Sequence, residues 1–96
     1  MNDINPHVVA ERMMTLSEEQ SRLSEESTTL EIAEVLYTHS HRAFHKSDKA
    51  TTTAWRVTDQ GMRQITVENR LKAIKDELSV IKNYLRHAEN RARNIY

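Results

Sequence analysis

The chain has 96 residues, with one glycine, one proline, no cysteine and a formal net charge of zero. One domain is expected at this length. A single glycine cannot supply the Gly-rich phosphate loops of nucleotide-binding folds or the turns of a small sheet, and the lack of cysteine excludes disulfide scaffolds and thiol catalysis. The mean hydropathy of −0.75 and the lack of a long uncharged apolar run predict no membrane span and no signal peptide. We therefore expect a cytoplasmic protein.

The zero net charge conceals an acidic part and a basic part of the chain. Residues 1–40 hold eight Asp and Glu against two Arg, a net charge of −6, and residues 41–96 hold twelve Lys and Arg against six Asp and Glu, a net charge of +6. The composition, with so few helix breakers, favours long helices. The charge division could serve a partner, or the pairing of the two parts with each other.

The first helix is expected over residues 6–46. Asn5 can cap its first turn, and Pro6 suits the first helical position, where a backbone N–H has no partner within the helix. Every seventh residue then belongs to an apolar column: Val9, Leu16, Leu23, Leu30, Tyr37 and Phe44. This column predicts the buried seam of the helix, and the apolar run at residues 30–37 predicts burial on more than one side.

A turn is expected near residues 47–51, followed by a second helix over residues 52–94 with Thr51 or a neighbouring threonine as its N-cap. Gly61 falls inside this helix and predicts a kink, because glycine costs about 1 kcal/mol relative to alanine there. Further along, apolar residues alternate between spacings of four and three: Val67, Leu71, Ile74, Leu78, Ile81, Leu85, Ala88, Ala92 and Ile95. A strict 3.5-residue repeat of this kind is typical of a coiled coil.

These elements predict an all-α protein, in which residues 1–96 form a single domain built as a long antiparallel helical hairpin or coiled coil. A lone hairpin has one contact seam and no enclosed core, so we expect it to assemble into an oligomeric helical bundle. The expected oligomer interface combines the apolar run of the first helix with the repeat of the second: Leu30, Ile32, Val35, Leu36, Leu71, Ile74, Leu78, Ile81 and Leu85.

Much of the charge is expected to cancel inside the hairpin. A fold-back near residue 49 would set position i opposite roughly position 100 − i, so that the glutamates of residues 18–31 would face the cations of residues 70–82. Two basic groups would remain without acidic partners. They are the turn group, Arg42, Lys46, Lys49 and Arg56, and the tail group, Lys82, Arg86, Arg91 and Arg93.

The basic group at the turn is the candidate functional site. Cations neutralise phosphates while aromatic rings stack on bases, so Lys and Arg interleaved with Phe44 and Trp55 suit single-stranded nucleic acid. We predict nucleic-acid contacts by five residues: Arg42, Lys46, Lys49, Arg56 and Trp55. The alternative is a solvated loop, with its cations favoured by the C-terminus of the first helix and with Trp55 packed on Phe44 across the turn.

Nothing in the sequence has the arrangement that catalysis needs. The adjacent carboxylates at positions 18–19 and 25–26 lie in a long polar helix rather than in a pocket that would tune their acidity. His41 and His45 have the i, i+4 spacing of a metal-binding pair, but a third ligand is not evident. We expect no enzyme activity, no metal site and no other cofactor.

Part of the chain resembles small helical-hairpin proteins encoded by tailed bacteriophages, which often accompany recombination or replication genes. The resemblance runs from Leu30 to about Arg93, about two thirds of the chain, and rests on these features: Tyr37, Ala43-Phe44, the Ser47 to Thr51 turn, Ala54 and the repeat Leu78, Ile81, Leu85. The last helix is also similar to phage recombination mediators of the UvsY type, through Glu77, Tyr84-Leu85 and Asn90-Arg91. Such mediators load a recombinase onto single-stranded DNA as oligomers.

The resemblance and the basic turn together predict an oligomeric phage accessory protein of the host cytoplasm that binds single-stranded DNA and assists recombination. The alternative is a coiled-coil protein-protein adaptor, or an inhibitor, that docks a protein partner through residues 30–37 and binds no nucleic acid. The expected partners are further copies of the chain, with single-stranded DNA or another protein as candidates and no membrane.

Overall fold

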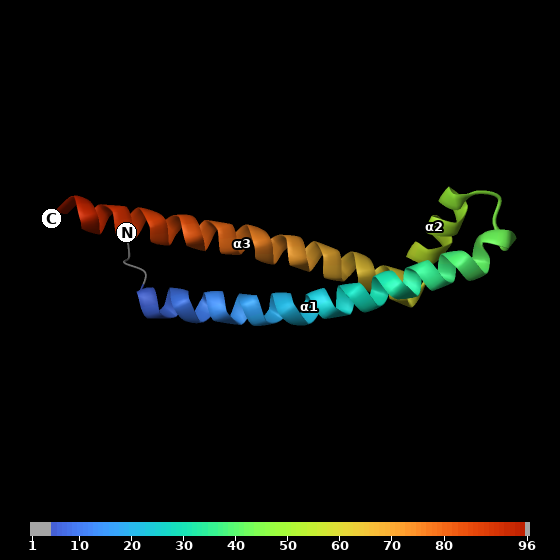
Figure 1. The fold of residues 1–96 in the computed structure, drawn as a ribbon, viewed down its shortest axis with the longest axis horizontal. Coiled ribbons are helices and arrows are strands. Elements are labelled where there is room, and N and C mark those ends of the chain that lie inside the picture. The colour runs from blue at the N-terminus through green and yellow to red at the C-terminus, as the bar shows by residue number, and fades with distance from the viewer. Residues whose placement is uncertain (1–4, 96) are drawn as a thin grey trace.

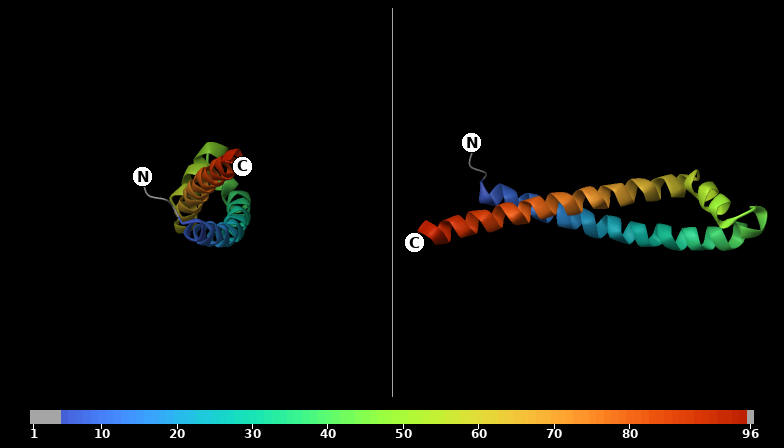
Figure 2. Two further views of the ribbon diagram at one scale, coloured as in Figure 1. Left: turned by 90° about the vertical axis from the view of Figure 1, so that its left-hand side faces the viewer. Right: turned by 90° about the horizontal axis from the view of Figure 1, so that it is seen from above.

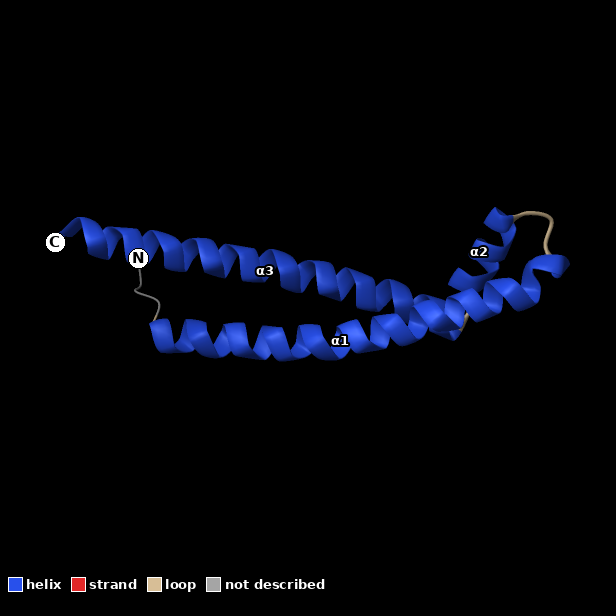
Figure 3. Ribbon diagram, in the orientation of Figure 1, coloured by secondary structure: helices blue, strands red, loops and turns tan. Residues whose placement is uncertain are grey.

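The computed structural model describes residues 5–95, and their side chains as far as Arg91. Its helices are α1 (Pro6–His41), the short 3-10 helix η1 (Arg42–Phe44), α2 (Asp48–Arg56) and α3 (Asp59–Ile95). The long helices α1 and α3 run antiparallel, and α2 lies at the end where the chain reverses (Figures 1 and 3). The molecule measures 68 × 20 × 20 Å. The predicted all-α helical hairpin is confirmed, and none of its described helices is long and apolar enough to cross a bilayer.

The start of α1 and the first four members of its apolar column are as predicted. Asn5 accepts a hydrogen bond from the backbone N–H of His7 (2.9 Å) through its side-chain oxygen, and Pro6 is the first helical residue. The first four members of the column are at most 7% exposed: Val9, Leu16, Leu23 and Leu30. A seven-residue spacing keeps these side chains on one face, and that face is covered by α3.

On α3, the heptad repeat supplies the other half of the seam. Val67, Ile74 and Leu78 are buried against the α1 column, and Met13, Leu71 and Ile81 pack around them. The two helices cross at a shallow angle in the view from above (Figure 2), as ridges-into-grooves packing of heptad faces requires. Each fully buried Leu, Ile or Val stabilises the fold by about 1.5 to 3 kcal/mol relative to exposure, so this seam is what holds the hairpin together.

Bidentate ion pairs accompany the seam and show its register. They occur at seven-residue intervals along α1: Arg12 with Glu77, Glu19 with Arg70, and Glu26 with Arg63. In each pair position i lies opposite position 89 − i, so the predicted register is wrong. The chain reverses earlier than expected because α1 ends at His41. Each arginine donates two hydrogen bonds to one carboxylate, and a slip of the helices by one turn would break all of them. The ion pairs therefore favour this register.

The same ion pairs predict a loss of stability in acid. Hydrogen bonds from arginine lower the pKa of Glu19, Glu26 and Glu77 below the ordinary value of 4.5. Because these pKa values are lower in the folded chain than in the unfolded chain, the stabilisation is complete above the ordinary value and is lost as the pH falls through the lowered one. Urea unfolding followed by circular dichroism should therefore show a lower midpoint at about pH 3 than at about pH 7.

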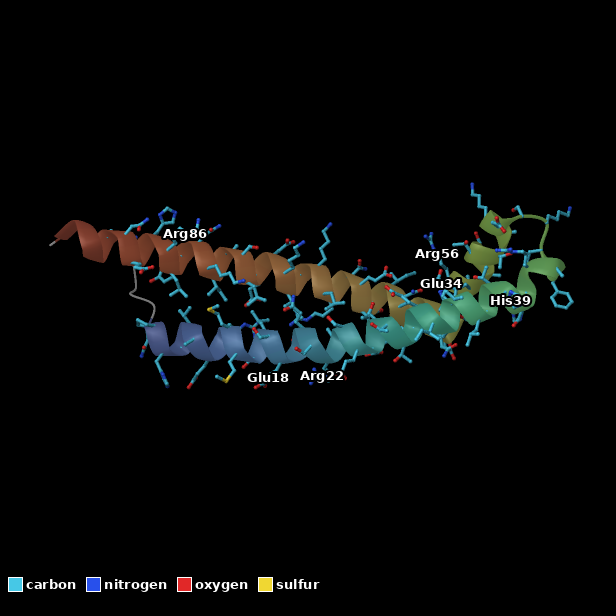
Figure 4. The ribbon with its side chains drawn as sticks, viewed as in Figure 1. Glu18, Arg22, Glu34, His39, Arg56 and Arg86 are labelled. Carbon is cyan, nitrogen blue, oxygen red and sulfur yellow. The ribbon has the colours of Figure 1, made fainter. Side chains whose placement is uncertain are left out.

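Two substitutions of glutamate by uncharged glutamine test whether the ion pairs cause this loss of stability in acid. Glu19→Gln should lower the midpoint at about pH 7 and have a smaller effect at about pH 3, where protonation of the native carboxylate has already weakened the pair. Glu18 is exposed on the side of α1 away from α3 (Figure 4), so Glu18→Gln is the matched control and should leave the midpoint unchanged. Equal effects of the two substitutions at about pH 7 would contradict this account.

The reversal differs from the predicted one at both ends. The first helix was expected to reach residue 46, and it ends at His41; the expected turn at residues 47–51 lies instead at 42–47. Ser47, and not Thr51, is the N-cap of α2, because its Oγ accepts from the backbone N–H of Ala50 (3.1 Å). Thr51 is fully buried and donates to the carbonyl of Ser47 (3.1 Å). The expected helix over residues 52–94 is two helices, α2 and α3.

The break between α2 and α3 lies just before Gly61. Thr58 donates its hydroxyl to the carbonyl oxygen of Trp55 (2.6 Å), and the hydroxyl oxygen accepts from the backbone N–H of Gly61 (3.0 Å). Thr58 is thus the N-cap of α3, and its carbonyl accepts the first hydrogen bond of that helix, from Met62 (2.9 Å). The predicted kink near Gly61 is instead a break at Val57 and Thr58 between two helices that run in different directions (Figure 1).

Candidate nucleic-acid interface

The reversal exposes a short basic segment, residues 42–49, which we call the tip. It comprises η1, the loop at 45–47 and the first two residues of α2. The N-cap at Ser47 and the acidic side chain of Asp48 in the first turn fix where α2 starts. The chain therefore turns sharply between two helix ends, and the tip lies at the extreme end of the molecule (Figure 1).

Three cations and one aromatic ring project from the tip into solvent. Arg42 lies 3.6 Å from Asp48, and both side chains remain largely exposed. Lys46 and Lys49 are exposed and form no ion pair within the described residues. Phe44 is 80% exposed, with only an edge contact to His41 at 6.3 Å between ring centroids. Exposed cations beside an exposed ring can meet a phosphate and a base at the same time.

Trp55 does not belong to this site, which corrects the prediction. Its side chain is 1% exposed, its Nε1 donates to Oε1 of Gln64 (2.6 Å), and its ring centroid lies 5.4 Å from that of Tyr37. No face of the indole is open to a base. Among the described residues, Trp55 makes its ring contact with Tyr37 and not with Phe44, the partner that was expected.

Arg56 is separated from the other predicted cations. It is the last residue of α2 and lines a surface cavity together with the carboxylates of Glu34 and Glu68. Figure 4 shows Arg56 and Glu34 at this end of α2, away from the tip. The acidic lining weakens any attraction for phosphate at this position. The structure therefore brings together Arg42, Lys46 and Lys49 but leaves Arg56 outside the site.

Phe44 was left out of the five predicted contact residues because the apolar column assigned it to the core. The column ends where α1 ends: Tyr37 is half-buried, and Phe44 lies in η1, beyond the last residue of α1. The early end of α1 also separates His41 from His45, which would otherwise share one helix face. His41 stacks on Tyr37 at 4.0 Å, and its Nδ1 lies 3.0 Å from the carbonyl oxygen of Tyr37. No three metal-ligating side chains cluster among the described residues.

The structure divides the predicted oligomer interface into two groups. Leu30, Ile74 and Leu78 are buried in the seam of a single chain, with Leu71 and Ile81 packed against them, so these side chains are already in use. Leu85 is half-buried further along α3. The remaining three, Ile32, Val35 and Leu36, are 57% to 66% exposed on α1. This second group presents the most exposed apolar surface of the predicted interface to another molecule.

The chain stands apart from the proteins with which it was compared. No family model, no curated protein and no solved structure matches it.

Proposed function

We propose that the chain is a nonenzymatic, self-associating accessory protein that binds single-stranded nucleic acid at the tip. The observation that carries the proposal is that one short exposed segment holds Phe44 and three cations, Arg42, Lys46 and Lys49, with Asp48 as its one carboxylate. Three arginine–glutamate pairs join α1 and α3 along the seam, whereas Lys46 and Lys49 form no ion pair among the described residues, so the tip carries positive charge that can meet a phosphate.

The resemblance to phage hairpin proteins and recombination mediators extends this proposal. A protein of that kind acts in the host cytoplasm and assists recombination by binding single-stranded DNA. Assisting recombination requires binding to single strands of any sequence. The tip supports this extension because a ring and a few cations bind single strands with little sequence preference.

A titration of labelled single-stranded DNA at several salt concentrations tests the proposal. Each cation that meets a phosphate contributes about 0.7 to the slope of log affinity against log salt, so Lys46→Ala with Lys49→Ala should lower that slope by about 1.4. Phe44→Ala should weaken binding by about 1 to 3 kcal/mol through lost stacking and leave the slope unchanged.

The matched control is Lys72→Ala with Lys75→Ala, which removes the same charge from exposed positions of α3. It should leave affinity and slope as in the parent protein. Parent binding without salt dependence, or an equal loss in the α3 double variant, would contradict binding at the tip.

The alternative is a protein-protein adaptor or inhibitor without nucleic-acid binding. The observation that favours it is the exposed apolar group Ile32, Val35 and Leu36, since contiguous apolar surface on a small protein marks a contact with another macromolecule. An adaptor would show no DNA affinity in the parent protein, so the same titration separates the two functions.

A further inference from the structure

The outer face of α1 carries an apolar patch that the hairpin does not use. Ile32, Val35 and Leu36 have the i, i+3, i+4 spacing of one helix face, and they are 57%, 66% and 63% exposed. Leu30, on the opposite face of α1, is buried in the seam against α3. We call Ile32, Val35 and Leu36 the α1 patch.

Two surface hollows flank Val35, the central residue of the α1 patch. One is lined by Glu31, Ile32, Val35 and Leu36, and the other by Glu34, Val35, Thr38, His39 and Arg42. In an antiparallel pair with a twofold axis at Val35, position i of one copy lies opposite position 70 − i of the other. The four residues that line the first hollow then lie opposite residues that line the second. In an isologous contact of this register, each hollow of one copy would therefore face the other hollow of its partner.

The charges on the two sides of the patch are opposite. Glu25 and Glu31 lie on the N-terminal side of the patch, whereas Arg42 and Lys46 lie on its other side, in the tip just beyond the end of α1, and all four are exposed. Two copies of α1 in parallel would set like charges together. Two antiparallel copies would set the acidic side of each against the basic side of the other, which lowers the energy of that arrangement alone.

We propose that the α1 patch is the contact between two copies of this chain, with α1 packed antiparallel on α1 of the partner and the twofold axis at Val35. Each copy covers the apolar side chains of the other, and Glu31 of each faces the side that bears His39 and Arg42 in the other. The inference rests on the self-association within the proposed function and does not require nucleic-acid binding.

Introduced cysteines test the geometry, because the native chain has none. Val35→Cys should form a disulfide-linked dimer on mild oxidation, since the two copies of this position meet at the axis. Val80→Cys, equally exposed on α3 at 67%, is the control and should remain mostly monomeric. A mixture of Glu31→Cys and His39→Cys should give mainly the mixed disulfide. Mainly Glu31→Cys self-linkage would indicate a parallel contact and overturn the proposal.

Mass in solution provides an independent test. Sedimentation of the parent protein at high micromolar concentration should show a dimer, and Val35→Asp should raise the dimer dissociation constant at least about tenfold, because it buries two unpaired carboxylates. Circular dichroism should show unchanged helicity, since this position is exposed in the single chain, and Val80→Asp should dimerise as the parent does. A monomeric parent, or an unchanged mass in Val35→Asp, would overturn the contact.

The two proposals can fail separately. Val35→Asp removes no cation of the tip, so a monomeric variant that retains DNA affinity supports both. A parent protein that dimerises as described but binds no DNA overturns the nucleic-acid function and leaves the α1 contact standing. A parent protein that binds DNA but stays monomeric overturns the α1 contact and leaves the nucleic-acid function standing.

Discussion

Trp55→Ala is expected to lower the free energy of unfolding by about 3 to 5 kcal/mol, which is the usual cost of removing a fully buried aromatic side chain. Trp55 is 1% exposed and joins α2 to Tyr37 of α1 and to Gln64 of α3. Its loss leaves a cavity where the three helices meet. Because it is the only tryptophan, its fluorescence cannot report on this variant, and urea unfolding should be followed by circular dichroism.

Two further variants separate packing from hydrogen bonding. Trp55→Phe retains an aromatic ring but leaves Oε1 of Gln64 without its donor, so a loss of about 1 to 3 kcal/mol is expected. Val57→Ala, two residues away and 71% exposed, should change the stability by less than about 0.5 kcal/mol. If Trp55→Ala and Val57→Ala unfolded at the same urea concentration, the indole would not be buried in solution.

This contact explains why the most conspicuous aromatic residue in the sequence was assigned to the wrong role. A tryptophan among cations suits base stacking, and nothing in the local sequence shows that Gln64 will lie beside it. Gln64 also donates to Glu34 (3.0 Å), so the buried polar chain joins three helices through residues 9 and 30 positions apart. Contacts of this kind depend on the register and on the direction of α2, which periodicity does not determine.

The long helices were predictable because their signals are local or periodic. Asn5 and Pro6 mark the start of α1, and the columns that contain Leu16 and Ile74 mark the two faces of the seam. The end of α1 has no glycine or proline to mark it. Because α1 ends early, Phe44 lies in solvent rather than in the core, and every ion pair between α1 and α3 has a different register from the expected one.

The second break did carry a signal. Thr58 and Asp59, a capping residue followed by an acidic first turn, form a helix-start pattern. The pattern competes with an uninterrupted run of helix-compatible residues, and Gly61 inside that run suggests only a kink. The packing of Trp55 between α1 and α3 decides between one bent helix and two helices. That packing requires α2 to leave the line of α3.

Gly61→Ala is expected to destabilise the protein by about 3 kcal/mol, although alanine is the better helix former. Gly61 is buried at the start of α3, against the last turn of α2. An added Cβ would collide with the carbonyl oxygen of Trp55 and would come within 2.7 Å of its carbonyl carbon and 2.9 Å of Cα of Arg56. Backbone atoms cannot move aside as a flexible side chain can, so α2 must shift relative to α3. Urea unfolding followed by Trp55 fluorescence measures the change.

The sign of this effect distinguishes two structures of the chain. In one continuous helix, an exposed glycine replaced by alanine would gain about 1 kcal/mol, because only helix propensity would change. With a break at Val57 and Thr58, the same substitution pushes two helix ends apart and also displaces the capping bond from the backbone N–H of residue 61 to Thr58. Gln60→Ala, exposed in the same turn, is the control for propensity and should change stability by less than about 0.5 kcal/mol. A more stable Gly61→Ala protein would mean that α2 and α3 are one helix in solution, and the burial of Trp55 and the direction of α2 would both be wrong.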